Sequence, residues 1–273
     1  MDSLTYTGTG GALSFDLVKL IRLGEGDPLR SRAWSRTLGY RSLSNLSRPA
    51  KEVTMQVSAT PESADEARRV FEVDMAANSP GVIDLNGWTQ RALVPESSNE
   101  VLRPSRVQLT LTVALLDGVW RREHLTHFMP LDLPLDIGEG KGYPHGYPYA
   151  YGVVSKPKSL AQPGYLPAPC KLVIFGPVSS PSITIGGNVY AYEWDVPSGG
   201  YLTIDGVAKT AVLTTQQGSP TNAMPGLVLG TGEGSGEFAF EPIKPGIQPL
   251  SWNGAFGFDA YLYEEEGEVP CCS

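Results

Sequence analysis

Cysteine is scarce in this sequence of 273 residues, and Cys170, Cys271 and Cys272 are too few for a disulfide framework. Long apolar runs are missing too, because none approaches the roughly 20 residues that a membrane-spanning helix needs. The N-terminal residues lack the basic segment of a signal peptide, and Lys19 and Arg22 interrupt the early apolar stretch. We therefore expect no membrane insertion and a protein that is made and folded in a cytoplasm.

The common motifs of catalysis and phosphate binding are also missing. The sequence has no Gly-x-Ser-x-Gly nucleophile elbow and no Gly-Lys-Ser/Thr phosphate loop. The glycine-rich run at residues 230–236 lacks lysine, and its Glu233 would repel a phosphate group, so it is interpreted as a mobile loop. We expect no catalytic residue, no cofactor and no bound metal, and we expect that the protein is not an enzyme.

Three polar groups are weaker candidates for chemistry. His124 and His127 have i, i+3 spacing, but no third metal ligand follows at a recognisable distance, so they are interpreted as ordinary side chains at a strand end. The acidic run at residues 264–268 is interpreted as a solvated end rather than a glycosidase pair. Adjacent Cys271 and Cys272 could bind a metal or pair with each other, although a frayed tail with incidental thiols is favoured.

Aromatic residues raise one further possibility, a sugar-binding face. Tyr190, Tyr192, Trp194 and Trp252 could line such a face, because aromatic rings stack on sugars. They could instead fill the core of a β-sandwich, with their polar atoms hydrogen-bonded at its edge. We favour the core.

Charge is distributed unevenly along the chain. Residues 1–130 carry 15 basic and 15 acidic residues, whereas residues 131–273 carry 6 and 14, which accounts for the net charge of −8. Every arginine lies at or before Arg122. Arginine is enriched in the cores of protein interfaces, so the first half suits self-association. An acidic second half argues against nucleic-acid binding.

The many glycines and prolines, 31 and 23, favour short strands with frequent turns. One helix is predicted, with Thr60 as its N-cap, Pro61 in its first turn and its end at Asn78. Its apolar residues at helical spacing are Ala64, Ala67, Phe71 and Met75. Alternating apolar residues before it, at 53–57, and after it, at 107–115, predict strands with one buried face. Residues 1–130 are therefore predicted to form an antiparallel β domain with one helix.

The remainder is predicted to be a connector followed by a second β domain. Residues 131–168 are rich in proline and tyrosine, which indicates an extended connector anchored by its aromatic side chains. From residue 169 to 273, strands are predicted at 172–175, 182–185, 189–194, 201–204, 211–213, 238–240 and 258–263, with a long surface loop at 216–236. Turns at 186–188 and 197–200 separate them. A β-sandwich of the jelly-roll type fits this order best.

The second domain carries the residues of a family resemblance. Phe175-Gly176-Pro177 and the run from Pro181 to Tyr190 resemble the opening strands of the C-terminal domain in distal tail proteins of siphophages. Residues 199–205, 209–210, 242–246 and 250–252 follow at the spacing of that family, and residues 143–151 are similar to its aromatic linker. The signature residues are Gly176, Pro177, Pro181, Ile183, Ile185, Gly186, Gly187, Asp205, Pro245 and Gly246. One departure is the acidic C-terminus, where relatives often end in basic residues and a proline.

The resemblance implies a structural component of the virion. Six copies would form a ring through the N-terminal domain, and galectin-like C-terminal domains would project outward. The ring would join the tail tube to tail tip or baseplate proteins, with DNA only passing through its channel. The alternatives are a carbohydrate-binding accessory module of a phage or bacterial surface apparatus, another tail component, and a hydrolase with a diverged site.

Overall fold

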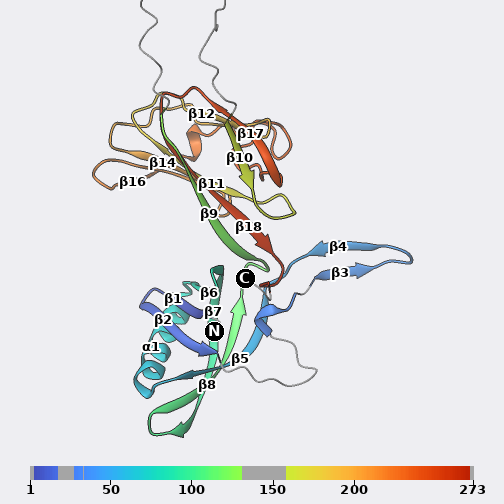
Figure 1. Ribbon diagram of the computed structural model, residues 1–273, viewed down its shortest axis with the longest axis vertical. Helices are drawn as coiled ribbons and strands as arrows, with labels where there is room; N and C mark the ends of the chain where they lie inside the picture. Colours follow the sequence, from blue (N-terminus) through green and yellow to red (C-terminus); the bar gives the residue numbers. More distant parts are fainter. Residues whose placement is uncertain (1–2, 18–27, 33, 131–157, 271–273) are drawn as a thin grey trace, which may run out of the picture. The chain divides into compact units, whose positions relative to one another are not determined.

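The computed structural model describes residues 3–17, 28–32, 34–130 and 158–270 (Figure 1). These described residues form antiparallel strands, one α-helix and two short 3-10 helices, which confirms the predicted mainly β fold class. The chain divides into two compact units. The first comprises Met1–Arg122 with Glu265–Ser273, and the second comprises Glu123–Glu264.

The first unit is built on a sheet of six strands that closes on itself. In hydrogen-bonded order the strands are β7 (Trp88–Arg103), β6 (Gly81–Leu85), β1 (Ser3–Gly8), β2 (Gly11–Leu17), β5 (Lys51–Ala59) and β8 (Arg106–Leu115). The circle is complete because β8 also pairs with β7, and all of these pairings are antiparallel. The predicted alternation in β5 and β8 is confirmed, since Val53, Met55 and Val57 are buried and so is every second residue from Val107 to Leu115.

The helix α1 (Pro61–Ala77) has the predicted ends. The Thr60 hydroxyl accepts a hydrogen bond from the Ser63 N–H, and Asn78 ends the helix in the left-handed conformation with φ of 47°. Its inner face packs on β1, β2, β7 and β8 and contributes Ala64, Ala67, Val70 and Phe71 to the core. The predicted inner position of Met75 is wrong. Met75 is exposed, and the polar Asp74 is buried instead.

A short hairpin of the first unit was not anticipated from the sequence. The 3-10 helix η1 (Pro28–Arg30) precedes strands β3 (Ser35–Leu38) and β4 (Leu43–Ser47), which form a separate two-stranded sheet. Every residue of both strands is exposed. The hairpin therefore adds no side chain of its strands to the core of its unit.

The second unit is a sandwich of two sheets. One sheet has the order β16 (Pro220–Asn222), β15 (Thr210–Thr214), β14 (Tyr201–Asp205), β11 (Cys170–Phe175), β18 (Phe258–Glu266) and β9 (Trp120–Phe128). The other has the order β10 (Lys158–Gln162), β17 (Gly246–Trp252), β12 (Ser182–Ile185) and β13 (Asn188–Ala191). Ile174 and Leu202 of the first sheet share one core with Ile183 and Leu250 of the second. The predicted β-sandwich is thus present. The strand predicted at 189–194 is β13, which ends earlier, at Ala191.

One detail of the second unit corrects the sequence interpretation. The predicted surface loop at 216–236 contains β16 and the 3-10 helix η2 (Met224–Gly226), and it buries Ala223 and Leu227. This part of the loop is held because Ala223 N–H donates to the Ala211 carbonyl and Leu227 bridges to Tyr192. Cys170 is buried, and burial raises the pKa of its thiol to about 12, so it behaves as an apolar residue.

The boundaries of the compact units differ from those of the predicted domains 1–130, 131–168 and 169–273. Strand β9 begins in the first unit and ends in the second, and the C-terminal residues return to the first unit. Residues 131–157 of the predicted connector, with the tyrosine-rich run, lie outside the described residues. Residues 158–162 of that connector are instead β10, because all five pair with β17 in the core sandwich.

Candidate functional site

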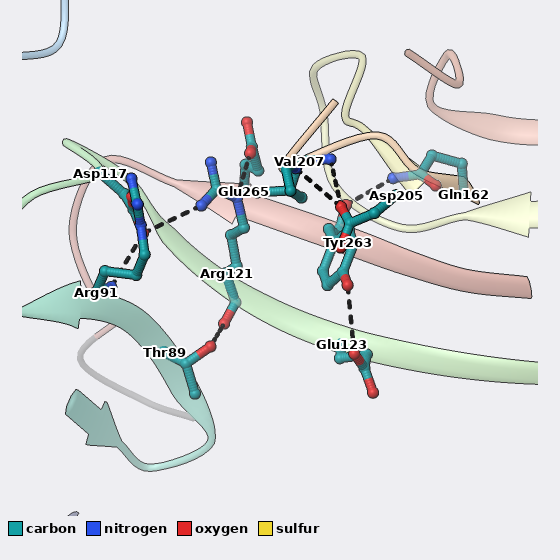
Figure 2. A network of polar contacts seen from close by, with 11 residues as sticks. Thr89, Arg91, Asp117, Arg121, Glu123, Gln162, Asp205, Val207, Tyr263 and Glu265 are labelled. Atoms are coloured by element: carbon teal, nitrogen blue, oxygen red, sulfur yellow. Dashed lines mark hydrogen bonds and ion pairs between the residues drawn. The ribbon is translucent and has the colours of Figure 1, made fainter. Parts of the chain in front are cut away.

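A chain of alternating charges lies in the first unit around Asp117 (Figure 2). Asp117 sits in the turn between β8 and β9, and its side chain is only 6% exposed. It accepts hydrogen bonds from the Arg91 backbone N–H at 3.0 Å and from Arg91 Nε at 2.8 Å. Arg121 of β9 lies 3.3 Å from the same carboxylate and donates from Nε to Glu265 at 2.7 Å. Charge-assisted bonds of this kind, partly shielded from water, fix the geometry of the groups that they join.

This network connects the C-terminal residues to the first unit. Glu265 pairs with Arg121, and four residues later Val269 is 1% exposed within the core of the first unit. The backbone at Gly267 passes close to Arg32, because a side chain there would lie 3.5 Å from Arg32 Cβ. The prediction that residues 264–268 form a solvated end is therefore wrong for Glu265. The sequence contained one signal, the apolar Val269 after a run of acids.

The two histidines take part in separate pairs in the second unit. His124 lies 3.4 Å from Glu264, and His127 Nδ1 lies 2.7 Å from Asp259. Each pair joins β9 to β18, in keeping with ordinary polar side chains on a strand. Across the described ranges, no group of three or more His, Cys, Asp or Glu side chains is placed to hold a metal ion.

A second polar group, within the second unit, links four strands. Glu123 of β9 accepts a hydrogen bond from Lys171 of β11 at 3.4 Å. It also accepts one from the Tyr263 hydroxyl of β18 at 3.4 Å (Figure 2). Buried Gln162 of β10 donates to the Tyr263 carbonyl at 2.8 Å. These bonds hold strands of the two sheets in register, and the side chains are those of a structural network.

The signature residues occupy turns and core positions of the second unit. Gly186 and Gly187 form the two-residue turn between β12 and β13 with φ of +60° and +91°, values that suit glycine in such hairpins. Ile183 and Ile185 on the preceding strand, together with Pro181, are buried. The family function of these residues stays a prediction, but each of them has a local structural role.

The other signature residues have comparable roles. The Asp205 carboxylate accepts from the Val207 and Ala208 N–H groups at 2.8 and 2.9 Å and so closes a turn after β14. The Pro245 carbonyl accepts a hydrogen bond from Gln248, and Gly246 opens β17 with φ of +87°. Gly176 lies so close to the Pro197 carbonyl that a β-carbon would approach its oxygen to 2.1 Å.

The aromatic residues divide between core and surface. Tyr190 and Tyr192 are buried, and Trp252 packs against the core and donates from Nε1 to the Phe256 carbonyl at 3.0 Å. Core placement is thus confirmed for these three. Trp194 is 50% exposed, with its ring edge toward Tyr192 at 6.0 Å between centroids. Trp194 alone of the four could still stack on a sugar.

An open pocket of about 400 Å³ lies beside the His127–Asp259 pair. Phe128, Phe256 and the signature residue Pro177 contribute apolar walls. Its lining is largely apolar, and none of its side chains forms a nucleophile–base pair. The pocket has the character of a contact surface more than that of a reaction site.

A buried carboxylate holds α1 against β1 in the first unit. Asp74 accepts hydrogen bonds from the Tyr6 hydroxyl at 2.8 Å, the Thr9 N–H at 2.9 Å and the Thr9 hydroxyl at 2.6 Å. Burial raises the pKa of Asp74, but the hydrogen bonds from Thr9 and Tyr6 outweigh burial and hold the pKa below its ordinary value. Burial together with the bond to Asp74 raises the pKa of Tyr6.

We expect Asp74→Asn to lower the free energy of unfolding by about 2–3 kcal/mol at pH 7, because hydrogen bonds to a buried charge are lost. The loss should shrink as the pH falls. A carboxylate with a lowered folded pKa stabilises above its unfolded pKa, about 3.9, and that contribution disappears as the pH falls through the folded value. Urea unfolding at pH 7 and pH 3 measures the difference. Asp65→Asn, at an exposed pair with Arg68, is the control and should change little. Equal effects of the two variants would contradict the role of Asp74.

Comparison with known proteins finds the same fold in phage tail structures. The Dit protein (gp 19.1) of phage SPP1, described as a paradigm of the hub adsorption apparatus in phages that infect Gram-positive bacteria, matches with a TM-score of 0.54 and 11% identity over 97% of this chain and 99% of that chain. Chains of the phage P2 baseplate in its activated conformation, with Ca or with Sr, match with a TM-score of 0.58 and 8% identity over 98% of this chain and 100% of theirs. The fold is that of phage hub and baseplate proteins.

No family model and no curated protein matches the sequence. The likeness therefore lies in the fold, and at 8–11% identity it extends through both units of this chain. The described part of the chain contains no helix of the length and apolarity that crossing a membrane requires.

Proposed function

We propose that this chain is a distal tail protein, the hub of a siphophage tail. Six copies form a ring through the first unit, and the ring joins the tail tube to tail tip or baseplate proteins. DNA passes through its channel without being read, and the second unit, galectin-like in its fold, faces outward. The protein acts in the virion after synthesis in the host cytoplasm, and its function is architectural, without a cofactor or a catalytic residue.

The observation that carries this proposal is a fold match over essentially the whole chain. A single sandwich or barrel domain is shared by many unrelated functions, so a likeness in one unit would mean little. Here a closed β unit with one helix and a β-sandwich occur in one chain, and the match covers at least 97% of it. The full-length correspondence supports a shared place in the tail. The sequence segments between residues 175 and 252 that resemble the family, at its spacing, point the same way.

Electron microscopy of the purified full-length chain tests the ring. We expect class averages with six-fold symmetry and a central channel, because a heterologous interface that closes after six copies gives such a ring. Particles of the size of one chain, or rings of another symmetry, would contradict the hexamer.

Carbohydrate binding is a second candidate, and exposed Trp194 is the observation that favours it. Its flanking residues Glu193 and Asp195 could accept hydrogen bonds from sugar hydroxyl groups. The Asp195 carboxylate already accepts a hydrogen bond from the Ser179 hydroxyl, and the backbone carbonyl of Glu193 accepts one from the Ser180 hydroxyl. Titration of cell-wall polysaccharide into wild type and Trp194→Ala separates the two functions. We expect no saturable binding tighter than about millimolar in either protein. Micromolar binding that Trp194→Ala abolishes would favour the carbohydrate-binding module.

A further inference from the structure

The glycine-rich run at residues 230–236 is held on both sides in the second unit. The Gly234 N–H donates to the Glu241 carboxylate at 2.8 Å, and the Gly236 carbonyl accepts a hydrogen bond from the Val189 N–H of β13 at 2.8 Å. A β-carbon at Gly234 or Gly236 would meet no atom within 4 Å. The run therefore borders open space, although its backbone is tied to two other segments.

A pocket of about 200 Å³ lies beside this run, and we call it the glycine-loop pocket. Its walls come from the turn between β12 and β13, from the glycine-rich run and from residues 241–248. Its polar side chains are those of Asn188, Tyr190, Glu241, Lys244 and Gln248. The glycine-loop pocket thus differs from the largely apolar pocket beside His127.

Two amide side chains in its wall have used their donors and keep oxygens for a ligand. Asn188 is 7% exposed and donates from Nδ2 to the Phe238 carbonyl at 3.0 Å, but its buried Oδ1 has no hydrogen-bond partner among the described residues. Gln248 donates from Nε2 to the Pro245 carbonyl, and its Oε1 lies 2.8 Å from where a β-carbon at Gly186 would stand. A buried acceptor without a donor costs free energy, so the pocket calls for a ligand that brings N–H or O–H groups.

The carboxylate of Glu241 favours a cationic donor, because hydrogen bonds between charged groups are the stronger ones. Its Oε2 already accepts the Gly234 N–H. A guanidinium group pairs best with both oxygens of one carboxylate in a plane, whereas an ammonium carries three donors on one compact centre. Acceptors on three separate segments, at Asn188, Glu241 and Gln248, suit the ammonium better.

Lys244 is the basic side chain of the pocket lining. It is exposed, and it forms no ion pair with Glu241 in the part of the chain that the structure describes. The carboxylate therefore stays available to a ligand, and Lys244 opposes a cation only through its own charge.

We propose that the glycine-loop pocket binds a primary ammonium group, from a free amine or from the lysine side chain of a partner protein. The ammonium donates to Asn188 Oδ1, the Glu241 carboxylate and Gln248 Oε1. This inference goes beyond the architectural function and does not depend on the ring, because every residue of the pocket lies in the second unit.

The first experiment titrates four probes into the full-length chain at constant ionic strength and follows them by saturation-transfer NMR. The probes are n-butylammonium, n-butylguanidinium, neutral n-butanol, and lysine blocked as its N-acetyl methylamide. We expect saturable binding of n-butylammonium at about millimolar concentration. Binding of n-butanol should be at least about tenfold weaker, since it lacks the charge, and n-butylguanidinium should also bind more weakly.

The second experiment repeats the n-butylammonium titration with three variants. Glu241→Gln keeps an oxygen for the Gly234 N–H but removes the charge, and should weaken binding by at least about tenfold. Glu233→Gln makes the same change at an exposed position of the glycine-rich run outside the pocket lining, and should leave binding unchanged. Lys244→Gln should tighten binding by about two- to fivefold, because an opposing charge is removed. A gain in affinity is a result that a folding defect cannot produce.

Each outcome supports or overturns the ammonium site. Blocked lysine that binds as tightly as n-butylammonium supports a partner's lysine, and n-butylammonium binding without binding of blocked lysine supports a free amine. Equal losses in Glu241→Gln and Glu233→Gln would overturn the site, since the amine would then be attracted only to an acidic surface. Binding of n-butanol or n-butylguanidinium as tight as that of n-butylammonium would overturn it as well. Absence of saturable binding by all four probes would leave the pocket to water. A wild-type chain that forms no ring, but binds the amine, would contradict the proposed function and leave this inference standing.

Discussion

Removal of residues 265–273 should destabilise the first unit while leaving the second unit intact. The truncation deletes buried Val269 and leaves Arg121 without its Glu265 partner, although Asp117 remains 3.3 Å from it. Burial of one Val side chain is worth roughly 1.5–3 kcal/mol, and a partly buried ion pair adds to this, so we expect a loss of roughly 3–5 kcal/mol in the free energy of unfolding. A loss of this size is a large fraction of the stability of an ordinary domain.

Hydrogen exchange resolved by peptide is the measurement for this prediction. Protection of β8 in the first unit should fall, and protection of β11 in the second unit should stay at the wild-type level. Val269→Asp should reproduce the effect, because it places a charge in the same core position. Ile247→Asp, at a position that is 78% exposed, is the control and should leave both strands unchanged. Wild-type protection of β8 in the truncated chain would show that the first unit does not depend on its C-terminal residues.

Gly176→Ala should destabilise the second unit by about 3 kcal/mol. A β-carbon there would lie 2.1 Å from the Pro197 oxygen and 2.7 Å from the Val196 oxygen. These are backbone atoms, and Val196 is held by two hydrogen bonds with Val178 at 2.8 and 3.0 Å, so the neighbours cannot move aside without breaking them. Overpacking of this kind typically costs 1–3 kcal/mol, and rigid neighbours place the cost at the upper end.

Thermal unfolding and the exchange of β11 amides measure the loss. Gly10→Ala is the matched control, because a β-carbon at Gly10 would meet only Val70 at an ordinary distance of 3.5 Å. A Gly176→Ala variant as stable as the control would mean that this signature glycine is not required by close packing.

The parts of the fold that could be predicted are those that local chemistry determines. Thr60 and Asn78 end α1 where capping rules place them, and the alternation in β5 and β8 identifies their buried face. The turn at Gly186 and Gly187 follows from the need for positive φ at both residues. Each of these signals lies within a few neighbouring residues, so one sequence is sufficient to recognise it.

The parts that escaped prediction depend on distant contacts. Nothing in residues 264–268 shows that Glu265 meets Arg121, 144 positions earlier in the chain. The choice of Asp74 over Met75 for the inner face of α1 depends on Tyr6 and Thr9, which supply the hydrogen bonds that a buried carboxylate needs. Strands β3 and β4 have little β-forming pattern of their own, and both are fully exposed.

The candidate site also contains residues that local sequence identifies and residues that only distant contacts reveal. The signature residues of the second unit were identified from the sequence, and their local geometry explains why glycine stands at Gly176 and Gly186 and aspartate at Asp205. The polar network of the first unit and the exposed hairpin of β3 and β4 were not identified. Both consist of common residue types, and their structural role depends on where the fold places them.

Location within the virion tests the hub directly. Antibodies against this chain, labelled with gold, can be imaged on phage particles that contain it. We predict labels at the junction between the tail tube and the tail tip, and none on the capsid or along the tube. Labels along the whole tube, on the capsid, or absent from the particle would contradict a hub function.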